Sequence, residues 1–317
     1  MRSSKSDRLI LGNSQNEAES CPKTTPMNLS AWFLAARPKT LLASVSPVAI
    51  GTALAAHEGK FHALAMLCAL VGAISIQIGT NFCNDYFDFF QGADTSDRKG
   101  PTRAVATGLI SPRAMAIATA MMFCITLLVT AYLYQRAGWP FLVIGVLSIV
   151  FGVFYTAGRF SLAYVGLGDP FVLVFFGPVA VAGTCYVQTL SLDWRVVVAG
   201  LAPGLLAVGL LVVNNLRDID EDRIANKRTL AVRFGKTFSR VQYTTCMVGA
   251  ALIPLLLVAM GITRGVLLAC LFVVPALLIV RLVWKRSGAD LRPCLGMTAG
   301  SLLLYTVLFC IGIQISI

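Results

Sequence analysis

Residues 62–88 read HALAMLCALVGAISIQIGTNFCNDYFD, and this stretch decides the class of fold. Its first part, residues 62–83, contains no Asp, Glu, Lys or Arg and is long enough to cross the ~30 Å hydrocarbon core of a bilayer as a helix. Asn84, Asp85 and Asp88 follow where that apolar run ends. The stretch therefore predicts a transmembrane helix that carries carboxylate and amide side chains to one face of a membrane.

The composition extends this interpretation to the whole chain. Of the 317 residues, 57% are hydrophobic and 13% are charged, against about 45–50% and 25% in soluble proteins. An ordinary soluble enzyme, a disordered chain and a coiled coil are excluded. We predict an all-α polytopic membrane protein, with a polar, disordered cytosolic tail at 1–30 and a membrane domain at 31–317. Nine helices are expected around a central cavity, near residues 40–56, 62–83, 114–134, 139–157, 167–188, 196–216, 241–260, 265–284 and 295–315.

Basic residues predict the orientation. Of the 26 Lys and Arg residues, all but Lys60, Arg136, Arg195 and Arg264 fall in the N-terminal segment, in the loops after the even-numbered spans or, for Arg281, in the last turn of the eighth span. Positively charged loops stay in the cytoplasm, so we expect a cytoplasmic N-terminus and an external C-terminus. The same asymmetry accounts for the net charge of +11, so a lipid bilayer is the expected partner and nucleic acid is not.

Two acidic motifs stand on the predicted cytoplasmic side. Asn84 and Asp88 follow the second span, and Asp218 and Asp222 follow the sixth. Side chains four residues apart lie on one face of a helix, one turn from each other. Because both segments run from an apolar helix through Asn and Asp into a basic stretch, they suggest two similar halves that face each other.

Oxygen ligands of this kind favour Mg²⁺, which usually takes phosphate oxygens as further partners. Nearby basic residues suit the outer charge of a diphosphate, which points to a prenyl diphosphate as substrate. Solvated loop charge is the alternative, and it fits Asp97 and Glu221 best, while Asp220 lies off the shared helix face. We expect Asp169 to cap the fifth span. The predicted metal ligands are Asn84, Asp85, Asp88, Asp94, Asp218 and Asp222, and the predicted diphosphate contacts are Arg98, Lys99, Arg103, Lys227 and Arg228.

The two motifs resemble the aspartate-rich motifs of the UbiA-type intramembrane prenyltransferases, and the resemblance covers residues 31–317. Within that superfamily the chain looks most like the branch that prenylates 1,4-dihydroxy-2-naphthoate. A third Asp is common in the superfamily where this chain has Gly92, and the displaced acid, Asp94, agrees with the naphthoate branch. The stretches that carry the closer match are 37–40, 84–94 with 100–103, 166–177 with 181–184, and 214–223 with 227–233.

The resemblance implies transfer of a polyprenyl group to an aromatic acid, with Mg²⁺ as cofactor and with loss of CO₂ and diphosphate. It implies a demethylmenaquinol-type product of menaquinone or phylloquinone synthesis, made at a bacterial cytoplasmic membrane. It also assigns Asp88 and Asp218 to catalysis and points to Arg37, Tyr155 and Arg159 as pocket residues. Three alternatives stay open: Tyr155 as a membrane-interface anchor, a different acceptor such as 4-hydroxybenzoate, and a transporter in place of an enzyme.

Overall fold

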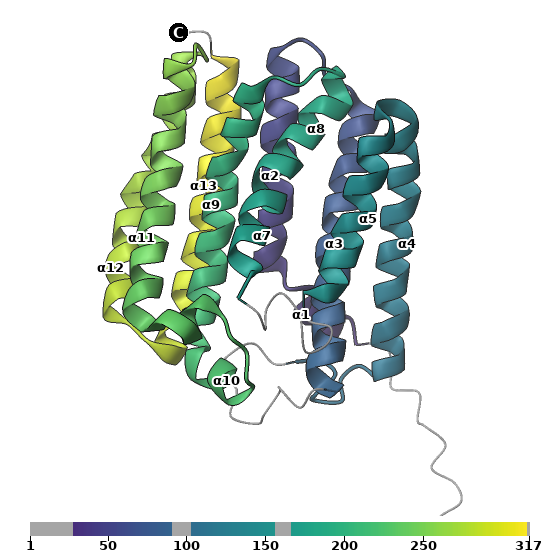
Figure 1. Ribbon diagram of the computed structural model, residues 1–317, viewed down its shortest axis with the longest axis vertical. Coiled ribbons are helices and arrows are strands. Elements are labelled where there is room, and N and C mark those ends of the chain that lie inside the picture. The colour runs from purple at the N-terminus through teal and green to yellow at the C-terminus, as the bar shows by residue number, and fades with distance from the viewer. Residues whose placement is uncertain (1–27, 91–102, 156–165, 316–317) are drawn as a thin grey trace, which may run out of the picture.

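The computed structural model describes residues 28–90, 103–155 and 166–315, and within these ranges the chain forms helices and turns without a strand (Figure 1). This confirms the predicted all-α class. The elements are α1 Leu29–Ala36, α2 Pro38–His57, α3 Ala63–Phe90, α4 Pro112–Ala137, α5 Trp139–Phe154, α7 Gly168–Val174, the π-helix η1 Phe175–Val179, α8 Ala180–Thr189, α9 Trp194–Arg217, α10 Ile219–Ile224, α11 Leu230–Ala259, the 3₁₀-helix η2 Arg264–Phe272, α12 Val273–Lys285, the 3₁₀-helix η3 Gly288–Leu291 and α13 Arg292–Gln314.

Every predicted span contains helix. In the described part of the chain, 8 helical segments are long and apolar enough to cross a membrane. The helix in the place of the fourth predicted span, α5, has 16 described residues and falls short of that length. The protein is therefore an integral membrane protein built from a bundle of apolar helices.

The boundaries differ most where a helix continues beyond its apolar part. α3 runs to Phe90, so the first acidic motif lies on the last two turns of a helix and not in a loop. α11 begins at Leu230, well before the predicted residue 241, because its first turns are polar. Hydropathy marks where a helix leaves the apolar core, whereas the backbone hydrogen bonds carry on into the polar region.

The bundle has three parts, which are visible in Figure 1. Helices α3, α4 and α5 pack against one another on one side, and α9, α11, α12 and α13 pack together on the other. Between them stand α2 and the α7–α8 span, with α2 in contact with α3, α8, α9 and α13. We call α2–α5 the first half and α7–α13 the second half.

The fifth span is broken in its middle by η1. Gly177 has a non-helical backbone (φ −116°, ψ −108°) and is followed by Pro178. A Cβ on Gly177 would lie 2.7 Å from the carbonyl oxygen of Gly200 in α9, so glycine is required for this approach. Below the break α7 packs on α9, and above it α8 packs on α2 and α3. The break therefore lets one span contact both neighbouring groups of helices.

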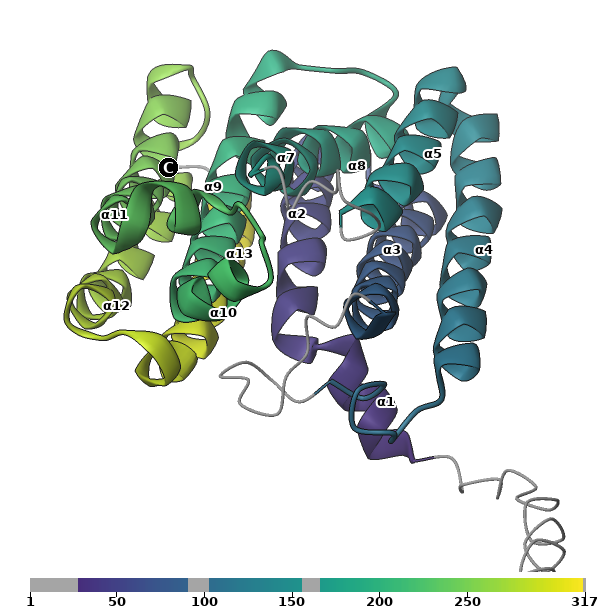
Figure 2. The same cartoon turned by 60° about the horizontal axis from the view of Figure 1, so that its bottom comes forward.

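One end of the bundle collects the segments that carry the motifs. The C-terminal end of α3, the α9–α10 junction and the beginning of α7 all lie at the lower end in Figure 1, away from the C-terminus. Figure 2 turns this end toward the viewer, with α10 and the end of α3 on either side of α2.

Candidate active site

The first acidic motif is buried at the end of α3. Asn84, Asp85 and Asp88 are all buried, and Asp88 is only 1% exposed. The chain that follows residue 102 returns to these acids: the backbone N–H of Ala104 donates to Asp85 Oδ2 over 3.1 Å, and the Arg103 guanidinium pairs with Asp88. Two carboxylates thus stay buried because a backbone donor and a cation compensate them.

The second acidic motif lies at the junction of α9 and α10. Arg217 donates through Nε and Nη2 to the two carboxylate oxygens of Asp218, each over 2.6 Å. The same Nη2 donates to Asn214 Oδ1 over 2.7 Å. Although α9 ends at Arg217, the N–H of Asp222 still donates to the carbonyl of Asp218 over 2.8 Å, so these acids lie one turn apart as predicted.

The segment that follows the second motif reaches the first motif across the two halves. Lys227, just beyond α10, places Nζ 3.4 Å from Asp88 Oδ1, although the two residues are separated by 139 positions in sequence. The next residue, Arg228, is exposed, and its carbonyl lies close to the chain before α7, where a Cβ on Gly166 would approach it to 2.7 Å. The prediction that both acidic motifs lie at one end of the bundle is confirmed.

Arg37 occupies a strained corner between α1 and α2. Its backbone is left-handed (φ 53°, ψ 68°), a conformation that non-glycine residues rarely adopt. Two side chains hold the corner: Asn81 of α3 donates to the Ala36 carbonyl over 2.9 Å, and the Thr40 hydroxyl donates to the Arg37 carbonyl over 2.9 Å. Strain that is held in this way is typical of functional positions.

Tyr155, at the end of α5, turns toward the second half. A Cβ on Gly168 would lie 3.3 Å from its hydroxyl, so the Tyr155 ring rests against the first turn of α7. The charges of Asp169, Asp222 and Arg37 all act on this hydroxyl. Tyr155 therefore lies at the interface between α5 and α7, where the two halves meet.

Four predicted site residues, Asp94, Arg98, Lys99 and Arg159, lie outside the described residues. The capping prediction for Asp169 is wrong. The N-cap of α7 is Leu167, which has no side-chain cap, whereas the Asp169 carboxylate accepts a hydrogen bond from Gln242 Nε2 of α11 over 2.8 Å. The partner that decides its role lies 73 residues away, where no local spacing could indicate it.

Sequence reasoning missed Asn214 and Arg217. A signal for Asn214 was available, because Asn214 stands four residues before Asp218 as Asn84 stands four before Asp88. Arg217 offered no comparable signal, since a lone basic residue at a helix end usually marks only the cytoplasmic side.

The donor set fits Mg²⁺ held jointly with a phosphate. The acids and amides of both motifs are hard oxygen donors, which this ion prefers. Across the described residues, no group of three or more His, Cys, Asp or Glu side chains forms a metal cage by itself. Mg²⁺ commonly uses one or two carboxylates and completes its shell with water and substrate phosphates, so a sparse protein contribution is sufficient.

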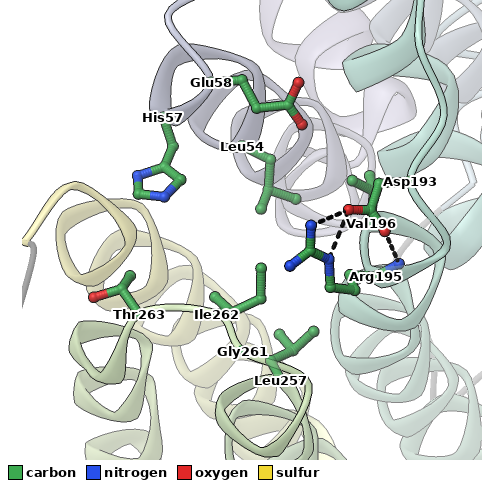
Figure 3. A pocket seen from close by; sticks show the side chains of 10 residues that line it. All are labelled: Leu54, His57, Glu58, Asp193, Arg195, Val196, Leu257, Gly261, Ile262 and Thr263. Carbon is green, nitrogen blue, oxygen red and sulfur yellow. Dashed lines mark hydrogen bonds and ion pairs between the residues drawn. The ribbon is translucent and has the colours of Figure 1, made fainter.

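A separate pocket of about 310 Å³ opens at the opposite end of the bundle (Figure 3). Arg195 faces it but donates to Asp193, over 2.6 Å from Nε, and this hydrogen bond holds the pKa of Asp193 below its usual range. Glu58 lines the same pocket and pairs with Lys60 over 3.4 Å. With its cation already neutralised and a second acid beside it, this pocket does not suit a diphosphate.

Comparisons with known proteins agree with this geometry. The sequence profile of the UbiA prenyltransferase family matches residues 44–311. The chain is 37% identical over 296 residues to a 1,4-dihydroxy-2-naphthoate octaprenyltransferase from Escherichia coli K12, covering 90% of this chain and 96% of the relative.

Solved structures share the fold at low sequence identity. A UbiA homolog from Aeropyrum pernix K1, solved in its apo form, superposes with a TM-score of 0.66 at 14% identity, covering 85% of this chain and 96% of the other. A UbiA homolog from Archaeoglobus fulgidus, bound to GPP and Mg²⁺, gives a TM-score of 0.60 at 14% identity, covering 88% and 99%.

Proposed function

Since the chain belongs to the UbiA prenyltransferase family, we propose that it transfers a polyprenyl group from a polyprenyl diphosphate to 1,4-dihydroxy-2-naphthoate. Diphosphate and CO₂ are the other products, and the prenylated ring is a demethylmenaquinol. The observation that carries the proposal is the contact of Lys227 with Asp88, because it supports one site made from both acidic motifs. The catalytic domain is residues 31–317, and residues 1–30 lie outside it.

The diphosphate is held at the end of the bundle where the motifs meet. Mg²⁺ would be held there by ligands drawn from Asn84, Asp85, Asp88, Asp94, Asp218 and Asp222, together with substrate phosphates, and it would neutralise the charge of the leaving diphosphate. Arg103 and Lys227 contact Asp88 in the protein itself, so both cations stand where the diphosphate charge arrives. The proposal also assigns Arg98, Lys99, Arg159 and Arg228 to binding of the diphosphate.

The reacting end of the donor is directed into the bundle. Arg37 and Tyr155 are assigned to the pocket that receives this end of the donor, and the Tyr155 hydroxyl lies against the first turn of α7. One turn from Tyr155, Phe151 packs edge-on against Phe171 of α7 with ring centroids 4.7 Å apart. Such apolar walls exclude water, which would otherwise capture the allylic cation before the aromatic ring attacks it.

The experiment is a reaction of purified protein in detergent with a polyprenyl diphosphate, Mg²⁺ and either 1,4-dihydroxy-2-naphthoate or 4-hydroxybenzoate. The expected product mass is that of the naphthoate acceptor with its carboxyl group replaced by the prenyl group. Product from 4-hydroxybenzoate alone would reject the naphthoate acceptor. Flux of a solute across vesicles, with no prenylated product from either acid, would favour the transporter alternative.

The motif end faces the cytoplasm under this proposal. Of the cations assigned to the opposite side, Arg195 and Lys60 lie at the end of the bundle that holds the pocket of Figure 3. The large excess of basic residues at the motif end supports a cytoplasmic N-terminus and a cytoplasmic supply of both substrates.

A further inference from the structure

Asp169 is a buried carboxylate that the proposed roles above leave unused. It lies in the first turn of α7, inside the fifth span, and is 6% exposed. Its hydrogen-bond partner is the neutral amide of Gln242, and over the ranges 28–90, 103–155 and 166–315 no basic side chain pairs with it. An acid in a membrane span without a cation is costly and is retained where it serves a function.

Aromatic side chains surround the part of the fifth span that carries Asp169. Asp169 acts electrostatically on the Tyr155 hydroxyl, at the end of α5. Deeper along the same α5–α7 interface, Phe171 and Phe175 stack with centroids 4.2 Å apart, and Phe151 meets both rings. The carboxylate and the aromatic rings thus belong to the same span, with the rings packed against α5 and the carboxylate bonded to Gln242 of α11.

Asp169 also lies apart from the two metal-binding motifs. Asp88 pairs with Arg103 and Lys227, and Asp218 with Arg217, so those acids are matched with cations at the diphosphate end. Asp169 has instead a single amide donor on one side. An ionised carboxylate has about four lone-pair sites, so capacity remains to accept a further hydrogen bond.

We propose that Asp169 accepts a hydrogen bond from a ring hydroxyl of the aromatic acceptor and that Gln242 orients the carboxylate for this contact. The proposal rests on the proposed function, which supplies a dihydroxylated ring. The proton stays on the hydroxyl oxygen, and its polarisation toward Asp169 raises the electron density of the ring that attacks the allylic carbon. Asp169 is then a catalytic residue and Gln242 a positioning residue.

The test combines Asp169→Asn with acceptors that lack one hydroxyl, 1-hydroxy-2-naphthoate and 4-hydroxy-2-naphthoate. Loss of a charge-assisted hydrogen bond should lower kcat/KM for the parent acceptor by roughly 10–150-fold. The donor KM should stay within about twofold. Removing the hydroxyl that Asp169 contacts should cost the wild type more than it costs D169N, because the variant has already lost the bond. Because both proteins are tested with the same analogue, its intrinsic reactivity cancels when the two losses are compared.

A binding measurement separates this role from a structural one. Naphthoate fluorescence reports binding of the monohydroxy analogues without donor or metal, and D169N should weaken binding of one analogue only. Gln242→Met keeps the carboxylate but removes its orienting donor, so it should impair acceptor use less than D169N and leave the melting temperature close to wild type. Asp193→Asn, an acid at the start of α9 at the opposite end of the bundle, is the matched control and should change neither constant.

Three outcomes would overturn the inference. One is a kcat/KM for the parent acceptor in D169N that equals the wild-type value. Another is a fall in kcat/KM from wild type to D169N that is equal for all three acceptors. If D169N does not fold, an acceptor KM in Gln242→Met that equals the wild-type value would also overturn the inference. Failure of the wild type to prenylate dihydroxynaphthoate would instead reject the proposed function, so the two failures are distinguishable.

Discussion

Replacement of Lys227 by Met tests the contact that joins the two halves. Its Nζ lies 3.4 Å from Asp88 Oδ1, and the two side chains are 14% and 2% exposed, so solvent screens this pair weakly. A charge-assisted hydrogen bond from this lysine to the donor diphosphate is worth about 1.5–3 kcal/mol. We therefore expect kcat/KM for the polyprenyl diphosphate to fall by roughly 10–150-fold. The acceptor KM should change little, because the acceptor ring lies deeper in the bundle.

The same substitution has a limited effect on stability. Arg103 still pairs with Asp88 when Lys227 is lost, so the carboxylate keeps one cation. The loss in the free energy of unfolding should stay below the 3–5 kcal/mol typical of a buried charge left without any partner. A melting temperature only a few degrees below wild type, measured in detergent, would agree with this.

The assay is initial rate against donor concentration at saturating acceptor. Lys227→Arg keeps the charge and should recover most of the activity. Lys236→Met removes an exposed cation on α11 at the same end and is the matched control, with constants within about twofold of wild type. A selective rise in the acceptor KM of K227M would refute the reasoning, since it would place the naphthoate carboxylate at Lys227. Unchanged constants would show that Lys227 only contributes to the charge that sets topology.

Three further predictions concern the metal site, the approach of Gly166 to Arg228 and the orientation in the membrane. Asp218→Asn should reduce turnover by roughly 100-fold or more, and chelation of Mg²⁺ should abolish wild-type turnover reversibly; activity that survives either treatment would reject the metal site. Gly166→Ala should add about 1–2 kcal/mol of left-handed backbone strain at φ +77° and push on the Arg228 carbonyl, which raises the donor KM. Gly59→Ala, at φ +69° with open space around it, carries the strain alone and should leave the donor KM unchanged. Protease sites inserted beside Gly59 and beside Arg228 should be cut from opposite faces of membrane vesicles, and cleavage from one face would contradict the predicted topology.

The sequence predicted the motifs well because helical spacing is local. Asn84 and Asp88 share a helix face in the structure, as their four-residue separation requires, since α3 continues through them to Phe90. Asp218 and Asp222 also lie one helical turn apart, as predicted, although α9 ends between Arg217 and Asp218. In both cases local backbone hydrogen bonds, from each N–H to the carbonyl four residues earlier, decide the geometry.

Contacts between distant segments could not be predicted in this way. Nothing near Lys227 in the sequence indicates Asp88 as its partner, and nothing near Asp169 indicates Gln242. The corner at Arg37 was hidden as well, because a left-handed residue before proline depends on Asn81 of another helix for support. These features follow from how whole helices pack, which the hydropathy of each span leaves open.

The break at Gly177 and Pro178 divides the fifth span into two parts with separate duties. α8 packs against α2 and α3, while α7 carries Asp169 and Phe171, whose ring stacks on Phe175 at the start of η1. The π turn, with the non-helical backbone of Gly177, interrupts the regular hydrogen-bond ladder between the two parts. Substitutions in α7 would therefore change residues beside the proposed acceptor site and leave the contacts of α8 with α2 and α3 in place.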